Sequence, residues 1–365
     1  MVRLPSGYGA WFCGSVGYDE QIVTSRGLGV FEVRSVVFSI SLLGILALPA
    51  SGHHSEAAFD TDTVVAFEGT VVEYGWRNPH VYIVVETNDS TGEPIQWQIE
   101  TSSTPILMRG GWTQDSLNDD EKVAVRVHPE RDTNRNYAIL LTLERNDGTV
   151  MSAASADPRG IVSASSLSGV WKGSGGQTEA EFRLRLANPA LTEKGAAAKE
   201  SYDFYADNPV ARCIAHTSPW LITTGLYLNE IELGDDVIVM RSEFFDVERT
   251  VFMDGRRHPD NVERTSQGYS IGWWEDDTLV VDTRQFADHP TGNGPGVPSG
   301  AQKHVIERYT LSGDGGRIIL DIFLEDSEYL AESLAGRVEW LHAPELQLYG
   351  YNCDPEISSR GFSLD

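Results

Sequence analysis

Ionisable and aromatic side chains concentrate in the turns and strands between residues 254 and 309. The stretch "HVIERY" places Glu307 and Tyr309 two residues apart, so on a strand both side chains face the same way, while Arg308 faces the other way. If that face lines a barrel, a carboxylate and a phenol stand in an apolar cavity. A desolvated Glu307 could then act as a general base, with Tyr309 or His258 as the acid. This chemistry suits an isomerase, a hydratase or a lyase without an organic cofactor.

Further residues of the same region can complete such a site. Asp254 in "DGRRHP" is another candidate for the catalytic set, and six more side chains can contact a ligand: Arg256, Ser270, Trp273, Trp274, Asp282 and His304. The indoles favour a hydrophobic small molecule with one or two oxygen atoms. A structural interpretation competes with this one. Asp254 and Arg256 can form an ion pair that closes a loop, and Glu307 can pair with Arg308 to hold strands in register.

A second group with metal-binding chemistry lies in "LALPASGHHSEAAFD", residues 46–60. Signal peptidase requires small residues before its cleavage site, and a cut after Gly52 makes His53 the first residue. A cut after Ala50 leaves Ser51-Gly52-His53, whose amine, amides and imidazole can bind Cu(II) in a plane. His54 and His80 are further candidate ligands. The alternative is that these histidines are solvated, or bonded to a backbone carbonyl, and bind no metal.

The elements before this segment predict export. Residues 36–48, "VVFSISLLGILAL", suit the apolar region of a secretory signal and are short for a membrane span, and Arg34 supplies the positive charge. Residues 1–29 carry no targeting pattern, which favours a true start near Val30 or Val33. We expect residues 1–52 to be removed, and no later run reaches the ~18 apolar residues of a membrane helix. The sequence predicts a periplasmic or extracellular protein without an integral membrane segment.

The cysteines agree with export. Cys13 lies in the segment that we expect to be removed, which leaves Cys213 and Cys353 as an even pair. In an oxidising compartment such a pair predicts one disulfide bond. The alternative is two buried free thiols.

Charge restricts the partners. The formal net charge is −26, and 41% of the 365 residues are hydrophobic, which is enough for a core. Such an acidic surface repels nucleic acid and anionic lipid. The sequence therefore argues against a nucleic-acid-binding protein, and it leaves the oligomeric state open.

Residues 53–151 form the first predicted domain. Five alternating apolar runs predict strands, with turn residues between them and one short helix in "STPILMRGGW": residues 64–76, 80–87, 94–101, 122–129 and 137–145. Three strands, a helix and two strands are the order of a small five-stranded OB-like barrel. Residues 152–168 are small, polar and without periodicity, which predicts a linker.

Residues 169–365 form the second predicted domain. Residues 187–205 are the convincing helical stretch, and several hairpins follow, with "EDD" and "GDGG" as turns. A long antiparallel meander favours closure into a lipocalin-like barrel or half-barrel, because closure removes exposed edges. The stretch "GSGGQ", residues 173–177, lacks the Lys-Ser/Thr pair and the following helix of a nucleotide loop. The predicted fold class is all-β with one or two short helices.

Two sets of motifs resemble known families. "HHS", "FEGTVVEYGWRNPH" and "RGGW" resemble the DUF6152 family of secreted bacterial domains without an assigned role. "DGRRHP", "GYSIGWWEDDTLVVDT" and "ERYT" resemble a segment common in secreted bacterial proteins. The resemblance implies export and architecture, and it supplies no catalytic residue set.

Three functions remain. The first is an exported protein that binds a hydrophobic small molecule in its second domain, and this interpretation requires least of the sequence. The second is an acid–base enzyme acting on such a molecule. The third is a copper protein built around His53, which is compatible with either of the others.

Overall fold

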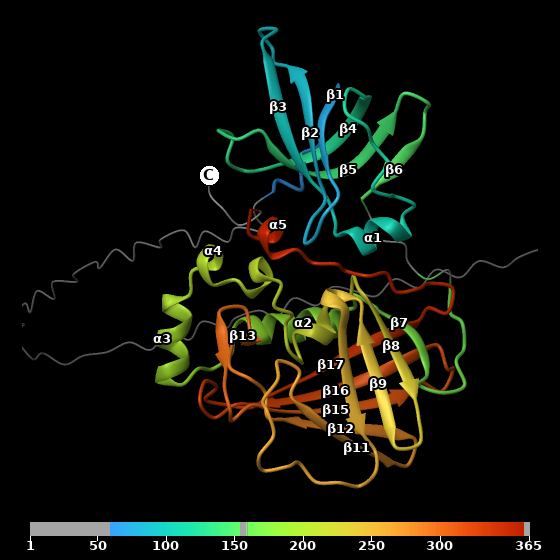
Figure 1. Cartoon of the computed structure of the whole chain (residues 1–365), viewed down its shortest axis with the longest axis vertical. Coiled ribbons are helices and arrows are strands. Elements are labelled where there is room, and N and C mark those ends of the chain that lie inside the picture. Colours follow the sequence, from blue (N-terminus) through green and yellow to red (C-terminus); the bar gives the residue numbers. More distant parts are fainter. Residues whose placement is uncertain (1–58, 154–157, 159, 361–365) are drawn as a thin grey trace, which may run out of the picture. The chain divides into compact units, whose positions relative to one another are not determined.

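The structure is a computed structural model that describes residues 59–153, 158 and 160–360. The predicted signal region, residues 1–52 with Cys13, lies outside the described residues, and so do His53 and His54. The described part contains two β barrels, one of five strands and one of nine, and few helices (Figure 1). The predicted all-β fold class is confirmed.

The first barrel has the predicted order of elements. Its strands and helix are β1 (Val65–Gly75), β2 (Tyr82–Asn88), β3 (Pro94–Glu100), α1 (Thr104–Arg109), β4 (Lys122–Pro129) and β5 (Tyr137–Arg145), and a short β6 (Val150–Ser152) extends the sheet. β1 pairs with β2 and β4, β2 pairs with β3, and β4 pairs with β5. A parallel pairing of β3 with β5 closes the sheet, which gives the strand connections of an OB-like barrel.

Alternating side chains explain the core of this barrel. In β4, Val123, Val125 and Val127 are buried and the residues between them are more exposed. They pack with Val71, Ile83, Ile99 and Leu143 in one apolar cluster. Of the described residues of the predicted linker, Ser152 ends β6, and the others lie in no helix or strand.

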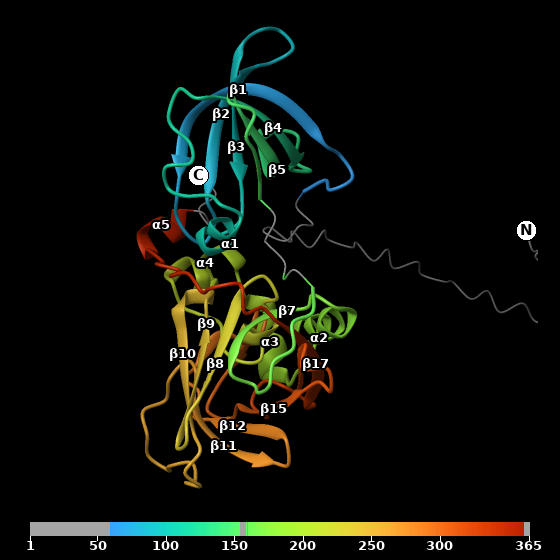
Figure 2. The same cartoon turned by 90° about the vertical axis from the view of Figure 1, so that its right-hand side faces the viewer.

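The second barrel is a closed sheet with the strand order β10-β11-β12-β15-β16-β17-β7-β8-β9. Its strands are β7 (Gly169–Gly173), β8 (Leu228–Leu233), β9 (Val237–Ser242), β10 (Val247–Phe252), β11 (Tyr269–Glu275), β12 (Thr278–Arg284), β15 (His304–Leu311), β16 (Arg317–Glu325) and β17 (Leu334–His342). Neighbours are antiparallel except β10 and β11, which pair in parallel. Figure 2 shows β8, β9 and β10 side by side. β13 (His289–Gly294) and β14 (Val297–Ser299) form a separate hairpin.

Helices of the second domain lie mainly between β7 and β8. They are α2 (Gln177–Ala187), α3 (Glu193–Ser201), α4 (Phe204–Asp207), η2 (Pro209–Arg212) and η3 (Leu221–Thr223), with η4 (Phe244–Asp246) and α5 (Pro355–Arg360) later in the chain. The predicted helical stretch at 187–205 contains α3. The expectation that no helix follows "GSGGQ" is wrong, because α2 begins at Gln177. Its polar first turn gives little apolar periodicity.

Helix α2 packs against β17 through one close approach. Phe182 is fully buried, and a Cβ added to Gly336 would lie 2.0 Å from its ring. Glycine at 336 is therefore required by packing. This contact fixes the start of the segment that leads from β7 to the 3-10 helices.

The predicted disulfide between Cys213 and Cys353 is confirmed. Their Cα atoms are 5.8 Å apart, and the bond joins residues 140 positions apart in the sequence. It ties the turn after η2 to the segment before α5. Because this segment follows the last strand, the bond holds the carboxyl-terminal part of the domain on the helical insertion.

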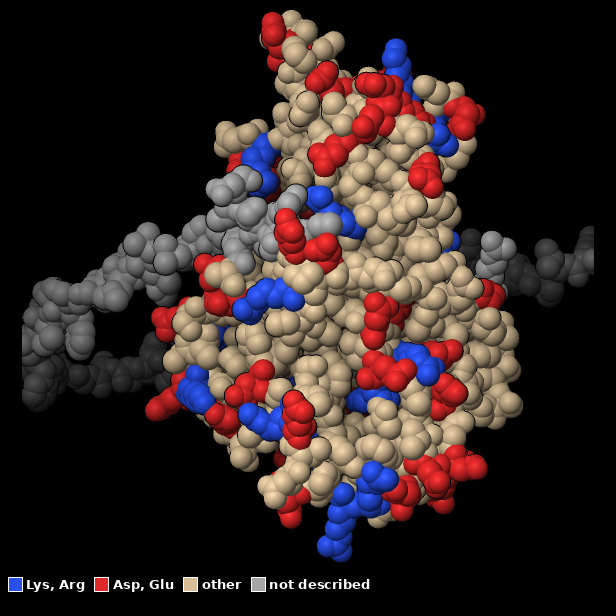
Figure 3. Space-filling model, in the orientation of Figure 1, with Lys and Arg blue, Asp and Glu red and all other residues tan. Residues whose placement is uncertain are grey.

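Acidic side chains are scattered over the visible surface of both barrels (Figure 3). This distribution agrees with the net charge of −26. Within the described ranges, no helix combines the length and apolar character needed to cross a membrane.

Candidate functional site

An ion pair crosses the interior of the second barrel. Arg249 lies on β10 and Glu307 on β15, and β11 and β12 separate these strands in the sheet, so the two side chains meet across the interior. Arg249 donates from both terminal nitrogens to the Glu307 carboxylate, at 3.0 and 2.5 Å. Both side chains are almost fully buried. Such a bidentate pair is strong and geometrically specific.

Two hydroxyl groups complete the cluster. Ser218 donates to the same carboxylate, and Tyr309 donates to it at 2.9 Å. Burial would raise the pKa of Glu307, but Arg249 and the two hydroxyls outweigh burial and lower it. The predicted orientation of Glu307 and Tyr309 is confirmed. The alternative pairing with Arg308 is wrong, because Arg308 faces outward and pairs with Glu275 on the neighbouring hairpin.

Little space remains beside this cluster. The cavity next to Arg249 and Tyr309 holds about 20 Å³ and is bounded by Leu221, Met240, Ser242 and Trp340. That volume accommodates about one water molecule. A ligand inside the barrel would therefore require the interior to open, and the Glu307 carboxylate already accepts four hydrogen bonds.

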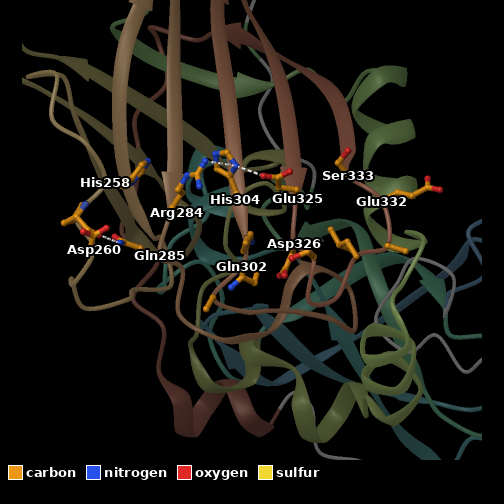
Figure 4. Close-up of a pocket in the computed structure, with 16 residues that line it drawn as sticks. His258, Asp260, Arg284, Gln285, Gln302, His304, Glu325, Asp326, Glu332 and Ser333 are labelled. Carbon is orange, nitrogen blue, oxygen red and sulfur yellow. Dashed lines mark hydrogen bonds and ion pairs between the residues drawn. The ribbon is translucent and has the colours of Figure 1, made fainter.

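A much larger cleft lies at the rim of the same barrel. Its volume is about 670 Å³, within the range of small-molecule sites. Four segments line it: residues 258–260 after β10, 284–285 at the end of β12, 301–304 at the start of β15, and residues between 325 and 333 at and beyond the end of β16. Figure 4 shows these side chains at the ends of the barrel strands. The lining is mostly polar and charged.

A histidine–carboxylate network forms one wall of this cleft. Asp282 Oδ1 lies 2.9 Å from His258 Nε2 and 3.0 Å from His304 Nε2. His304 Nδ1 lies 2.9 Å from Glu325 Oε1, a contact visible in Figure 4. Arg284 approaches both Asp282 and His304, at 3.4 and 3.3 Å. On β12, the residues on either side of Asp282 are buried, so the Asp282 side chain points away from the barrel interior. The network therefore lies on the outer face of the barrel.

The network sets the charges of its members. Burial disfavours ionised Asp282, but the hydrogen bonds from His258 and His304 hold the pKa of this carboxyl far below its usual range. Burial also opposes protonation of His304, and its bonds to Asp282 and Glu325 nevertheless raise its pKa. His258 differs, because its Nδ1 is buried and has no hydrogen-bond partner among the described residues. With Nε2 donating to Asp282, Nδ1 carries a free lone pair.

Lys303 is a cleft residue that the sequence analysis did not single out. Its side chain is 1% exposed, and Nζ donates to Thr217 Oγ1 and to the Gly292 carbonyl, both at 2.5 Å. Burial lowers the pKa of Lys303 to about 7, against the attraction of Asp326 and Glu307. The signal that could have found it is a single lysine directly before a strand that carries His304 and Glu307.

Other predicted site residues lie outside the cleft. Ser270 is buried and bonds to Thr283 at 2.8 Å, so it faces the interior. Trp273 and Trp274 are 40% and 47% exposed, so the expectation that they lie beside an apolar cavity is wrong. The pairing of β10 with β11 ends before these two residues, which leaves this part of β11 without a described partner strand on that side. The predicted ion pair of Asp254 with Arg256 is confirmed, and Arg256 lowers the pKa of Asp254 to about 2.

The predicted metal ligands are not brought together by the described residues. His53 and His54 lie outside them, and His80 Nδ1 contacts Glu100. In the part of the chain that the structure describes, no three His, Cys, Asp or Glu side chains are grouped so that they could hold a metal ion. Copper binding at the amino terminus stays a prediction.

The comparison with known proteins concerns mainly the first barrel. Residues 42–138 match the DUF6152 family. That family is of unknown function, so the match confirms the resemblance of this region and adds no chemistry. No curated protein matches the chain.

Two solved structures show a distant likeness. The fluorescent protein UnaG is 10% identical, with 48% of this chain and 96% of that chain covered and a TM-score of 0.25. A protein of unknown function from the DUF3598 family of Nostoc punctiforme is also 10% identical, with 76% and 95% covered and a TM-score of 0.19. These scores carry no argument about function. The site must be interpreted from its own geometry.

Proposed function

We propose that this is an exported protein whose second barrel binds a small molecule in the rim cleft. The observation that carries the proposal is the convergence of four chain segments on a space of about 670 Å³. Small-molecule sites are concave and place a few polar groups where they fix the ligand. The disulfide between Cys213 and Cys353 is consistent with an oxidising compartment.

The lining refines the ligand expected from sequence. Pro259, Ala301, Leu330 and Ala331 supply apolar surface, while charged residues of both signs surround them. A wholly hydrophobic molecule would leave those charged groups without water or partners, which costs free energy. We therefore propose a ligand with an apolar body and at least one polar group.

Acid–base catalysis at the same cleft is a second candidate. The observation that favours it is the pairing of His258 with Asp282, which leaves His258 Nδ1 as a buried lone pair. A carboxylate that fixes the tautomer of a histidine makes the opposite nitrogen a proton acceptor. We therefore propose His258, in the wall of the cleft, as the base. It replaces Glu307, which is paired with Arg249 in the barrel interior.

Native mass spectrometry of the protein released from its producing cells tests the binding proposal. We expect a co-purified small molecule at one equivalent, which is lost in Ala301→Trp, because the indole fills the cleft. The matched control is Ala335→Trp, at an exposed position of β17 that does not line the cleft. A molecule retained equally by both variants contradicts the proposal. Turnover that disappears in His258→Gln, with binding retained, would support the enzyme.

A further inference from the structure

The charged side chains that line the rim cleft are mostly acidic. Two of them are basic and four are acidic: Arg284, Lys303, Asp260, Glu325, Asp326 and Glu332. A cavity with more carboxylates than cations attracts positive charge, and the net charge of −26 on the whole chain adds to that attraction. The charge of the cleft therefore favours a cationic ligand over an anionic one.

Both basic side chains of the cleft are already engaged by the protein. Arg284 Nε lies 3.4 Å from Asp282 Oδ1, and Arg284 Nη2 lies 3.3 Å from His304 Nδ1. Lys303 is 1% exposed, and its Nζ donates to two buried oxygens that line no part of the cleft. An anionic ligand would have to compete with these contacts and would also approach the four carboxylates. The cleft is therefore poorly suited to an anion.

Three of the four carboxylates are accessible, and Asp326 is the exception. Asp326 is buried, and both of its oxygens accept hydrogen bonds from the protein. Asp260, Glu325 and Glu332 are exposed residues of the cleft lining. Glu325 contacts His304 through Oε1 alone, and no ion pair joins Asp260 or Glu332 to another described residue. These three side chains therefore have carboxylate oxygens that a ligand can reach.

The accessible carboxylates are spread along the cleft. Figure 4 shows Asp260 and Glu332 at opposite ends of the labelled group, with Glu325 between them. Among the described residues, no three His, Cys, Asp or Glu side chains are grouped so that they could share one metal ion. Leu330 and Ala331 add apolar surface to the same lining. This arrangement suits an extended organic cation whose charges are separated by a carbon chain.

We propose that the rim cleft binds an extended aliphatic amine with two or more protonated nitrogens. The proposal rests on the proposed binding function, since it names the ligand class of the same cleft. A protonated amine donates hydrogen bonds and accepts none, which matches carboxylate oxygens. The carbon chain between the nitrogens covers Leu330 and Ala331. Because each exposed ion pair is weak, affinity depends on one ligand forming several of them together.

Isothermal titration calorimetry of the full folded protein with spermidine, in about 0.15 M salt, tests the proposal. We expect one equivalent to bind, and butylamine, which has a single nitrogen, to bind at least about tenfold more weakly. The double variant Asp260→Asn/Glu332→Gln should weaken spermidine binding about tenfold. The matched control is Asp276→Asn/Asp277→Asn, which removes the same charge from an exposed turn outside the cleft. Ala301→Trp should abolish binding, because the indole fills the cleft.

Equal weakening by the two double variants overturns the inference, since spermidine would then bind the acidic surface in general. Butylamine that binds as tightly as spermidine, or spermidine binding that persists in Ala301→Trp, overturns it as well. Failure of the binding function gives a different result. If Ala301→Trp loses a co-purified molecule that is not an amine, the ligand class is wrong and the cleft still binds. If the co-purified molecule is retained by Ala301→Trp, the binding function itself is wrong.

Discussion

Arg249 and Glu307 join opposite walls of the second barrel through two parallel hydrogen bonds of 3.0 and 2.5 Å. Both side chains are almost completely buried, so the contribution of the pair to the free energy of unfolding depends on both partners being present. Removing one partner leaves an uncompensated buried charge, whereas replacing both with apolar residues can be neutral.

Arg249→Met should therefore destabilise the protein by about 3–5 kcal/mol in urea denaturation, and the double variant Arg249→Met/Glu307→Met should recover much of that loss. The matched control is Arg308→Met, because Arg308 is adjacent in sequence to Glu307 and pairs with Glu275 at the surface. It should change the free energy of unfolding by less than about 1 kcal/mol. Equal losses in Arg249→Met and Arg308→Met would contradict the interior assignment.

The alternation of side chains along one strand predicted the inward positions of Glu307 and Tyr309, but it could not predict their partner Arg249. Alternation along "HVIERY" is enough to direct Glu307 and Tyr309 inward and Arg308 outward. The partner of Glu307 lies 58 residues earlier on β10, and no local pattern signals that two strands face each other across a closed sheet. The number and order of strands in a barrel are set by such non-local pairings.

The missed helix and the missed cleft have related causes. Helix α2 buries Phe182 and Leu186 but presents no wide apolar stripe, so its sequence does not stand out. The cleft is formed by four segments that are mostly loops, and loops lack periodicity. The sequence identified His258, Asp282 and His304 as candidate site residues. Only the fold shows that one oxygen of Asp282 lies within hydrogen-bond distance of both histidines.

Asp282→Asn should change the titration of His304. Wild-type His304 has a raised pKa, so its ionic contacts contribute stability below about pH 6.5, and that contribution is lost as the pH rises through the folded value. The variant should titrate at lower pH by NMR, and its stability deficit should be larger at pH 6 than at pH 9. Asp260→Asn, another carboxylate of the cleft, is the control. An unshifted His304 in Asp282→Asn would exclude the proposed network.

His289 should make the fold sensitive to acid. Burial, with help from the charge of Lys303, lowers the pKa of His289 to about 4, although the hydrogen bond to the Ala215 carbonyl acts in the opposite direction. The Thr291 amide donates to the other ring nitrogen, which must be unprotonated to accept this bond. The unfolded chain then binds the extra proton between about pH 6.5 and 4. Stability should fall over that window by about 1.4 kcal/mol per pH unit for this group.

Urea denaturation of His289→Gln at pH 4.5, 5.5 and 6.5 measures this effect. The variant should show a shallower dependence of unfolding free energy on pH than the wild type, although His216, whose pKa burial lowers to about 3, keeps part of the slope. Gln98→Ala, at an exposed residue of the other barrel that does not titrate, should leave the slope unchanged. The assignment is wrong if the wild type and His289→Gln have parallel profiles.

Loss of the disulfide should weaken the second domain. Cys213→Ala/Cys353→Ala removes a cross-link between residues 140 positions apart, and such bonds contribute about 2–5 kcal/mol. We expect a lower urea midpoint for the variant, and the same midpoint for wild-type protein under reducing conditions. Reductant that leaves the wild-type midpoint unchanged would show that the bond contributes nothing. The variant itself serves as the control, because reductant should not shift its midpoint further.

Processing of the amino terminus decides the copper prediction. Cleavage after Ala50 or Gly52 would expose Ser51 or His53, and mass spectrometry of secreted protein should find one of these as the first residue. Calorimetry with Cu(II) should then show binding that weakens steeply below about pH 6.5, because the amine and imidazole must lose protons to bind the ion. His53→Ala should abolish it, with His128→Ala as the matched control. Copper bound equally by His53→Ala, or an intact Met1 on the secreted product, would contradict the prediction.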